Sequence, residues 1–376
     1  MKIKMCHHRL ALAVAFVACL SVVRATTRGN AAEPPSVKTT TVLNGLDNPA
    51  AVVNRPGTNE LFISESGAGQ VVRMLTDRPG VVAPVVTGFS VAAAPGGLGF
   101  QVGPLGIAFL DRVTFAVGGG GAGEGHDVLK IYPLPPSDKS LKADDVRQTL
   151  GPIGAGADSQ AAEGFFYGVA TMPNAIFVTS RGDNTAGWVS RAFVLDNNGK
   201  AADLKPLING LSENLSREGG QSPFVPKTPQ KGTVPAGGPT ALTISKRGEL
   251  VVGESGPFDK PHDSSIAFYN PKNGKLLLTM RTGLSDIMGL AYCPHSGNLY
   301  AIDLAWSDPK EGGLYRLDAT RLDGKMGVKA IKIAPLDKPS SLSFASDGAL
   351  YITLLGTAKE GAKQKPGQLV KITGDL

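Results

Sequence analysis

Two copies of a Glu-Ser-Gly sequence place a carboxylate and a hydroxyl directly after a short apolar segment. The first is Glu65 to Gly67 in "NELFISESG", and the second is Glu254 to Gly256 in "GELVVGESG". Carboxylate oxygens are the ligands that a hard cation such as Ca²⁺ prefers. Duplication is also typical of repeated architecture. The two copies are therefore either two parts of one chemical site or one structural unit used twice.

A repeated unit surrounds both copies. Each unit has a turn with Pro or Gly, an apolar strand, a second turn, a second strand that ends near a polar residue, a loop and a third strand. Six units begin at Asn48, Gly103, Phe166, Gly238, Ile287 and Lys338. This pattern predicts an all-β fold, a six-bladed β-propeller of four-stranded antiparallel blades. Residues 33–376 are expected to form this single domain.

The segment "VKTTTVLNG" from Val37 resembles the outer strand of a unit, although it precedes the first unit. The last unit stops soon after its third strand. We therefore expect the N-terminal strand to complete the last blade and close the ring.

The N-terminus reads as an export signal. A basic stretch precedes the apolar run Leu10 to Val23, which is short for a membrane span. We expect cleavage of residues 1–32, a periplasmic or extracellular location and no stable membrane span in the mature protein. An uncleaved anchor or a lipoprotein at Cys19 are the alternatives.

Charge and cysteine content argue against a nucleic-acid-binding protein and against a disulfide-stabilised fold. Residues 1–32 contain five Lys or Arg and no acid, so their removal lowers the formal charge from +6 to +1. That balance leaves no basic surface for nucleic acid. Cys293 is the one cysteine after residue 32, so an internal disulfide is excluded.

The repeat resembles several propeller families. The pattern P-x-G-[LI]-A-F followed by D-G-x-L-Y-[VI] is similar to the unit of NHL, strictosidine-synthase-like, gluconolactonase/regucalcin-like and soluble quinoprotein sugar-dehydrogenase propellers. The resemblance covers residues 37–376 and implies a central site at one mouth of the ring. It does not select one of these families.

In such propellers the residues just after the second strands converge at the mouth. These residues are Glu65 and Ser66, Glu124 and His126, Arg181, Asp183 and Asn184, Glu254 and Ser255, and Asp303. Glu65, Glu254 and Asp303 are candidate ligands of Ca²⁺ or another divalent cation. The candidate ligand-binding residues are His126, Arg181, Asp183 and Asn184. Polar residues at strand ends also commonly cap turns, and Glu65 and Glu254 belong to opposite units of the ring.

Resemblance to gluconolactonases implies a metal-dependent lactone or ester hydrolase, with Asp303 in "LYAIDLAWSD" as the catalytic base. Met288 occupies the position of that family's metal-binding Asn, and Glu163 is the nearest counterpart of its Glu. Resemblance to quinoprotein dehydrogenases requires a histidine at the mouth, for which His126 and His262 are available.

Two long insertions enter first strands on the mouth side, beginning at Gly88 and Leu211. They are expected to act as lids, with apolar surface from Phe89, Phe100, Phe224 and Trp306. The leading hypothesis is an exported propeller that binds a small molecule, glycan or protein at its mouth, with or without a divalent metal ion. The lactonase and the quinoprotein sugar dehydrogenase are the alternatives.

Overall fold

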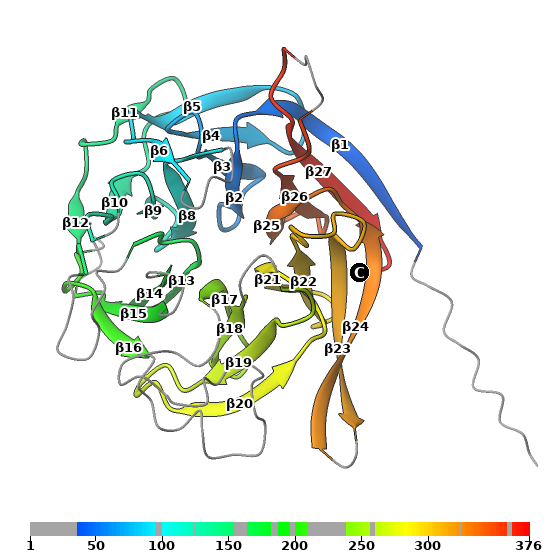
Figure 1. The fold of residues 1–376 in the computed structure, drawn as a ribbon. Helices are drawn as coiled ribbons and strands as arrows, with labels where there is room; N and C mark the ends of the chain where they lie inside the picture. Colours follow the sequence, from blue (N-terminus) through cyan, green and yellow to red (C-terminus); the bar gives the residue numbers. More distant parts are fainter. Residues whose placement is uncertain are drawn as a thin grey trace, which may run out of the picture. The chain divides into compact units, whose positions relative to one another are not determined.

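Six antiparallel sheets follow one another around a ring in the computed structural model (Figure 1). The chain divides into residues 1–34 and residues 35–376, and all described residues lie in the second unit. They are residues 36–94, 100–123, 125–153, 164–181, 187–195, 200–208, 238–255, 260–322, 325–358 and 363–376. None of them belongs to a helix that could cross a bilayer.

The first three blades follow the first three sequence units. Blade one contains β2 (Pro49–Asn54), β3 (Glu60–Glu65), β4 (Gln70–Leu75) and β5 (Val82–Thr87), with β11 (Leu141–Lys142) parallel to β5. Blade two contains β8 (Pro104–Phe109), β9 (Thr114–Gly119), β10 (Leu129–Pro133) and β12 (Gln148–Leu150). Blade three contains β13 (Val169–Met172), β14 (Ala175–Arg181), β15 (Gly187–Phe193) and β16 (Lys205–Ile208).

The other three blades complete the ring. Blade four contains β17 (Pro239–Ile244), β18 (Leu250–Glu254), β19 (Ser265–Tyr269) and β20 (Leu276–Arg281). Blade five contains β21 (Ile287–Tyr292), β22 (Leu299–Asp303), β23 (Gly313–Leu322) and β24 (Lys325–Pro335). Blade six contains β25 (Pro339–Phe344), β26 (Leu350–Leu354), β27 (Gly367–Gly374) and β1 (Val37–Leu46). A short hairpin, β6 (Ala92–Ala93) and β7 (Gln101–Val102), lies between blades one and two in sequence.

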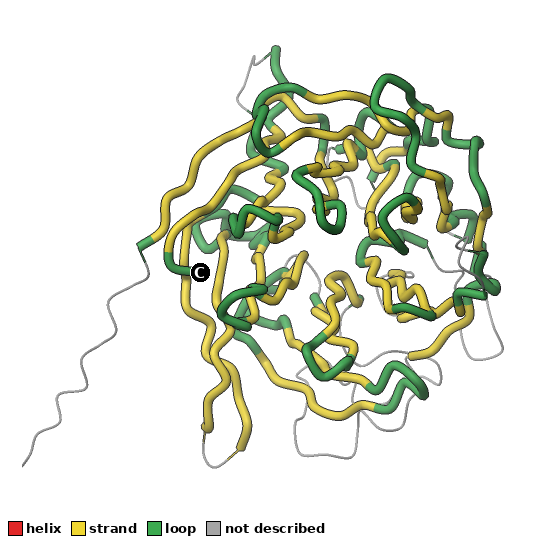
Figure 2. The backbone as a smooth tube through the Cα atoms, turned by 180° about the vertical axis from the view of Figure 1, so that it is seen from behind, coloured by secondary structure: helices red, strands yellow, loops and turns green. Residues whose placement is uncertain are grey.

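The N-terminal strand closes the ring, as the sequence predicted. β1 pairs antiparallel with β27 from Val37 opposite Gly374 to Leu46 opposite Gly367. Seen from behind, the same two strands run together along the outer edge of the last blade (Figure 2). Blade six is thus built from both ends of the propeller sequence.

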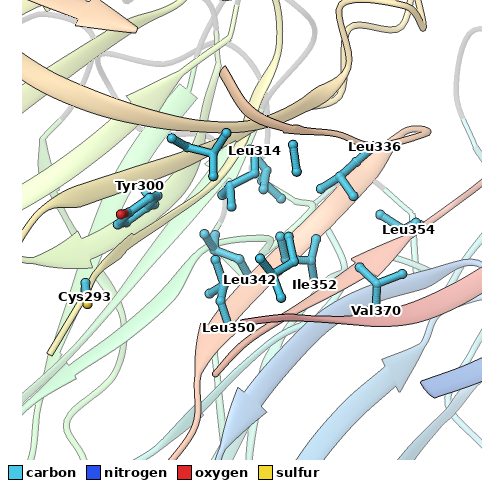
Figure 3. Packing of buried hydrophobic residues seen from close by; sticks show 13 residues of the cluster. Cys293, Tyr300, Leu314, Leu336, Leu342, Leu350, Ile352, Leu354 and Val370 are labelled. Atoms are coloured by element: carbon cyan, nitrogen blue, oxygen red, sulfur yellow. The ribbon is translucent and has the colours of Figure 1, made fainter. Parts of the chain in front are cut away.

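Each strand presents alternate side chains to its two neighbouring blades. In β3, Leu61 and Ile63 pack in the cluster between blades six and one, whereas Phe62 packs between blades one and two. Six such clusters fill the six blade interfaces. Figure 3 shows the one between blades five and six, where Leu314 and Leu342 lie among residues of both sheets.

Small residues let the innermost strands approach one another closely. A Cβ atom on Gly106 would lie 2.2 Å from the Tyr167 main-chain oxygen, and one on Gly168 would lie 2.5 Å from the Thr240 oxygen. Side chains at these positions would push neighbouring blades apart.

Deletion of residues 36–46 tests the closure. The truncation removes the β1–β27 ladder and the buried Leu43 and Leu46. We therefore expect the free energy of unfolding to fall by at least about 5 kcal/mol, or the chain not to fold. Thermal and urea unfolding followed by circular dichroism measure this effect. The exposed Thr40→Ala is the control within β1. A truncated chain that melts with the parent would contradict the closure.

Candidate functional site

The mouth is the face formed by the segments that enter the first strands and leave the second strands. The same hydrogen bond occurs there in four blades. In each of them, the residue after the second strand donates its N–H to the carbonyl of the residue before the first strand. The pairs are Ser66 to Asn48 (3.1 Å), Ser255 to Gly238 (3.2 Å), Leu304 to Asp286 (2.9 Å) and Leu355 to Lys338 (2.9 Å). The mouth loops are therefore held in equivalent positions.

Glu65 ties together two segments of the first blade. Its carboxylate accepts hydrogen bonds from the Asp47 N–H at 3.0 Å and from the Gln70 side chain at 2.7 Å, and only 7 % of the residue is exposed. Both carboxylate oxygens are thus engaged by protein groups.

Asp303 has a similar role in blade five. It accepts hydrogen bonds from the N–H groups of Ser285 (2.9 Å), Asp286 (2.7 Å) and Ala305 (3.1 Å), and is 1 % exposed. Burial raises the pKa of this carboxyl above its ordinary value, while the three N–H groups lower it in part. The side chain links the loop before β21 to the loop after β22.

Glu254 lies in a different environment from Glu65, although the local sequence is the same. Its oxygens accept hydrogen bonds from the hydroxyls of Ser265 (2.6 Å) and Tyr269 (3.3 Å). Burial raises its pKa from 4.5 to about 7, and the two hydroxyls offset this only in part. This carboxyl therefore titrates near neutral pH.

The serines of the two Glu-Ser-Gly copies bind the next blade. Ser66 Oγ accepts the Gly103 N–H at 2.7 Å, and Ser255 Oγ donates to the Ile287 carbonyl at 3.0 Å. In each copy, glutamate anchors its own blade and serine anchors the following one.

The structure does not bring Glu65, Glu254 and Asp303 together. Among the described residues, no group of three His, Cys, Asp or Glu side chains is placed to hold a metal ion. The described carboxylates therefore do not fit a shared Ca²⁺ site, and their assignment as ligands stays a prediction.

The other predicted site residues are only partly described. His126 is exposed in the β9–β10 loop. Arg181 ends β14, where the backbone alone is described. Glu124, Glu163, Asp183, Asn184 and Phe224 lie outside the described residues.

An aromatic cluster instead occupies one side of the mouth. The rings of Phe100 and Trp306 lie 5.8 Å apart, and Lys338 Nζ lies 4.4 Å from the Trp306 ring centroid. These mouth cluster residues come from the hairpin before blade two, the loop after β22 and the segment before β25. The expected proximity of Phe100 to the mouth is thus observed, whereas Phe89 packs against Tyr132 at 6.1 Å.

Tyr167 crosses the centre of the ring. Its hydroxyl, which comes from the entry to blade three, donates to the Ser340 carbonyl of blade six at 2.6 Å. Tyr167 also lines a cavity of about 130 Å³, to which the first strands of all six blades contribute. Ala50 and Leu105 pack with Tyr167 in a further apolar cluster, so apolar side chains fill the centre of the mouth.

Backbone strain is concentrated in the mouth loops. Asn48, Phe165 and Lys338 precede or enter first strands with φ of 51°, 53° and 51°. Such conformations cost free energy for residues other than glycine and gather at functional sites. The buried Asp127 accepts a hydrogen bond from the Phe165 N–H at 3.1 Å and helps to hold the strained conformation of Phe165.

Sequence reasoning missed Lys338, Asn48, Tyr167 and Asp286. The signal available for two of them was a polar residue directly before the proline that begins a first strand, in "DNPA" and "DKPS". Nothing in the local sequence indicates that Tyr167 reaches the opposite blade.

Asp303→Asn tests the anchoring role. The amide nitrogen cannot accept a hydrogen bond from a backbone N–H, so at least one of the three bonds is lost in a buried site. We expect the free energy of unfolding, measured in urea, to fall by about 2 to 3 kcal/mol. The exposed Asp138→Asn is the matched control. Equal stability of the two variants would argue against anchoring.

Glu254→Gln tests the titration. A carboxyl whose pKa is raised on folding favours the folded state below its unfolded pKa, and this contribution is lost as the pH rises through the folded pKa. Between pH 4 and pH 8, the free energy of unfolding of the parent should therefore fall by on the order of 3 kcal/mol relative to that of the variant. Parallel pH profiles of unfolding free energy would show that Glu254 does not titrate in this range.

Comparisons with known proteins agree with this architecture. No family model and no curated protein matches the sequence, but solved structures match over most of the chain. An oxidoreductase described as a glucose dehydrogenase, from Thermus thermophilus, has a TM-score of 0.56 at 18 % identity, over 90 % of this chain and 100 % of its own.

Two further solved structures show the same likeness. The PQQ-bound aldose sugar dehydrogenase of Streptomyces coelicolor has a TM-score of 0.52 at 16 % identity, over 91 % of this chain and 100 % of its own. A protein described as a gluconolactonase has a TM-score of 0.50 at 13 % identity, over 91 % of this chain and 93 % of its own. At these identities the likeness concerns the fold, and the chain shares the six-bladed propeller of these enzymes.

Proposed function

We propose that the propeller binds a small carbohydrate at its mouth, through Trp306, Phe100 and Lys338. The observation that carries this proposal is the Trp306 ring, which contacts an aromatic ring and a cation contributed by two other segments. Small-molecule sites commonly combine apolar ring surface with a few polar groups that set orientation.

The charge of Lys338 supports the proposal. No carboxylate of the described residues lies within ion-pair distance of its ammonium group, whereas Asp47 pairs with Lys365 at 3.1 Å. Lys338 is half-buried, so its charge is available to a polar or anionic ligand group beside the Trp306 ring. Asn48, which donates to the Gln101 carbonyl at 2.5 Å, places a further polar side chain at the mouth.

A carbohydrate is the ligand class suggested by proteins that share this fold. The solved structures that share this fold include proteins described as sugar dehydrogenases and a gluconolactonase. Those names belong to those proteins, and for this chain they indicate which probes to use first.

A metal or a quinone cofactor finds little support among the described side chains. The three candidate carboxylates are separate, and the centre of the mouth contains Tyr167, Ala50 and Leu105. His126 is exposed, and His262 Nδ1 lies 3.0 Å from the Gly283 carbonyl oxygen. We therefore derive no catalytic step through either group.

We also propose that the protein is exported after cleavage of residues 1–32. The support is the basic and then apolar N-terminal sequence. N-terminal sequencing of the protein recovered from periplasmic and culture fractions tests this, and an intact Met1 in the exported fraction would argue against cleavage.

Isothermal titration with D-glucose, D-gluconate and D-glucono-1,5-lactone tests the binding site. Trp306→Ala should weaken every probe that binds by about tenfold or more, equivalent to about 1.4 kcal/mol. Lys338→Met should weaken gluconate more than glucose, because only gluconate is charged. The exposed Lys139→Met is the control for a lost surface charge.

Absence of binding by all three probes, or unchanged binding by Trp306→Ala, would overturn the carbohydrate proposal. Metal analysis of the purified protein and lactone hydrolysis with and without chelator accompany the titration. Turnover that is sensitive to chelator and lost in Asp303→Asn, at a pH where this variant is folded, would instead favour the hydrolase.

A further inference from the structure

We infer that Asp286 is a positioning residue that presents the Trp306 ring to the mouth. The inference rests on the proposed function only for its effect on binding, since the geometry of the loop stands by itself. Asp286 lies directly before β21, and Trp306 lies three residues after the end of β22.

Two aspartates join these segments in opposite directions. Asp303, on the β22 side, accepts the N–H groups of Ser285 and Asp286 at 2.9 and 2.7 Å. Asp286, on the β21 side, accepts a hydrogen bond from the main-chain N–H of Trp306 at 2.8 Å. The Leu304 N–H also donates to the Asp286 carbonyl at 2.9 Å. The loop from Asp303 to Trp306 is therefore held at both of its ends.

The residue between the two anchors has a strained backbone. Ala305 has a φ of 44° and is 1 % exposed, and its N–H donates to Asp303 at 3.1 Å. A left-handed conformation at a residue other than glycine persists only where surrounding contacts enforce it. The bonds made by Asp303 and Asp286 lie on either side of Ala305 and help to enforce its conformation.

The result of this arrangement is a fixed direction for one side chain. Trp306 leaves the loop immediately after the strained residue and meets Phe100 and Lys338, which belong to other parts of the ring. Without the Asp286 anchor the backbone at Ala305 could relax to an ordinary conformation, which would turn the indole away from both partners.

In five blades the first strand begins opposite the end of the second strand. Among these five, blade five alone has a carboxylate directly before its first strand. The first strand begins opposite the end of the second at Pro49, Pro104, Pro239, Ile287 and Pro339. The preceding residues are Asn48, Gly103, Gly238, Asp286 and Lys338. The general loop geometry therefore does not require an acid, and the acid coincides with the blade that carries the tryptophan.

Intrinsic fluorescence tests the inference without any ligand. The chain has two tryptophans, so Trp188→Phe leaves Trp306 as the sole emitter. In this background Asp286→Ala should shift the emission to longer wavelength and raise the acrylamide quenching constant by about twofold or more. Asp286→Asn should stay near the parent, because its amide oxygen can still accept the Trp306 N–H.

A purely structural role would lower the melting temperature of Asp286→Ala without moving the emission of the folded protein. Unchanged emission and quenching in folded Asp286→Ala would therefore overturn the inference. If Asp286→Ala does not fold, Asp286→Ser provides the second test, because the serine hydroxyl is too short to reach the main-chain N–H of Trp306 that the Asp286 carboxylate accepts. Increased quenching in Asp286→Ser supports the inference, and quenching equal to the parent contradicts it.

Binding of the sugar probes separates this inference from the proposed function. If a probe binds the parent, Asp286→Ala should weaken it by about as much as Trp306→Ala, while Asp286→Asn keeps most of the affinity. If no probe binds while the fluorescence result holds, the carbohydrate proposal fails and the positioning role of Asp286 stands.

Discussion

Contact between each blade and the next is the interaction on which the rest of the structure depends. A single four-stranded sheet of this size has two apolar faces and buries neither by itself. Six sheets arranged in a ring bury both faces of every sheet, provided that the last blade also meets the first. The seam is therefore reinforced: Ser340 Oγ of blade six donates to the Pro49 carbonyl of blade one at 2.6 Å, and Ser341 Oγ accepts the Val52 N–H at 3.2 Å.

The same requirement explains the duplicated Glu-Ser-Gly sequence. Where a second strand ends, backbone N–H and carbonyl groups of the mouth loops lose their strand partners and need others. Glu65 and Ser66 supply them within blade one and toward blade two. Ser255 does the same between blades four and five. Repetition thus arises from a repeated structural need.

The proposed binding site uses a different set of residues. Trp306, Phe100 and Lys338 come from segments where the blades differ from one another, and they meet only at the mouth. One support of Trp306 is an ordinary part of the repeat, because Asp303 occupies the position of Glu65 and Glu254 in its own blade. The other support, Asp286, is specific to blade five. The repeated architecture holds the loops, and the variation between loops brings the residues of the proposed site together.

The sequence by itself determined the number of blades and the closing role of Val37–Leu46, because both follow from local periodicity, and the structure confirms them. Only the tertiary structure decided what the mouth residues do. Glu65 and Glu254 are both followed by Ser-Gly in sequence, yet Glu65 binds a backbone N–H while Glu254 is enclosed by two hydroxyls and titrates near neutral pH. Tyr167 and Ser340 are far apart in the chain and meet across the ring. Burial, charge and partners depend on contacts between distant segments, and the spacing of residues along one blade contains no information about them.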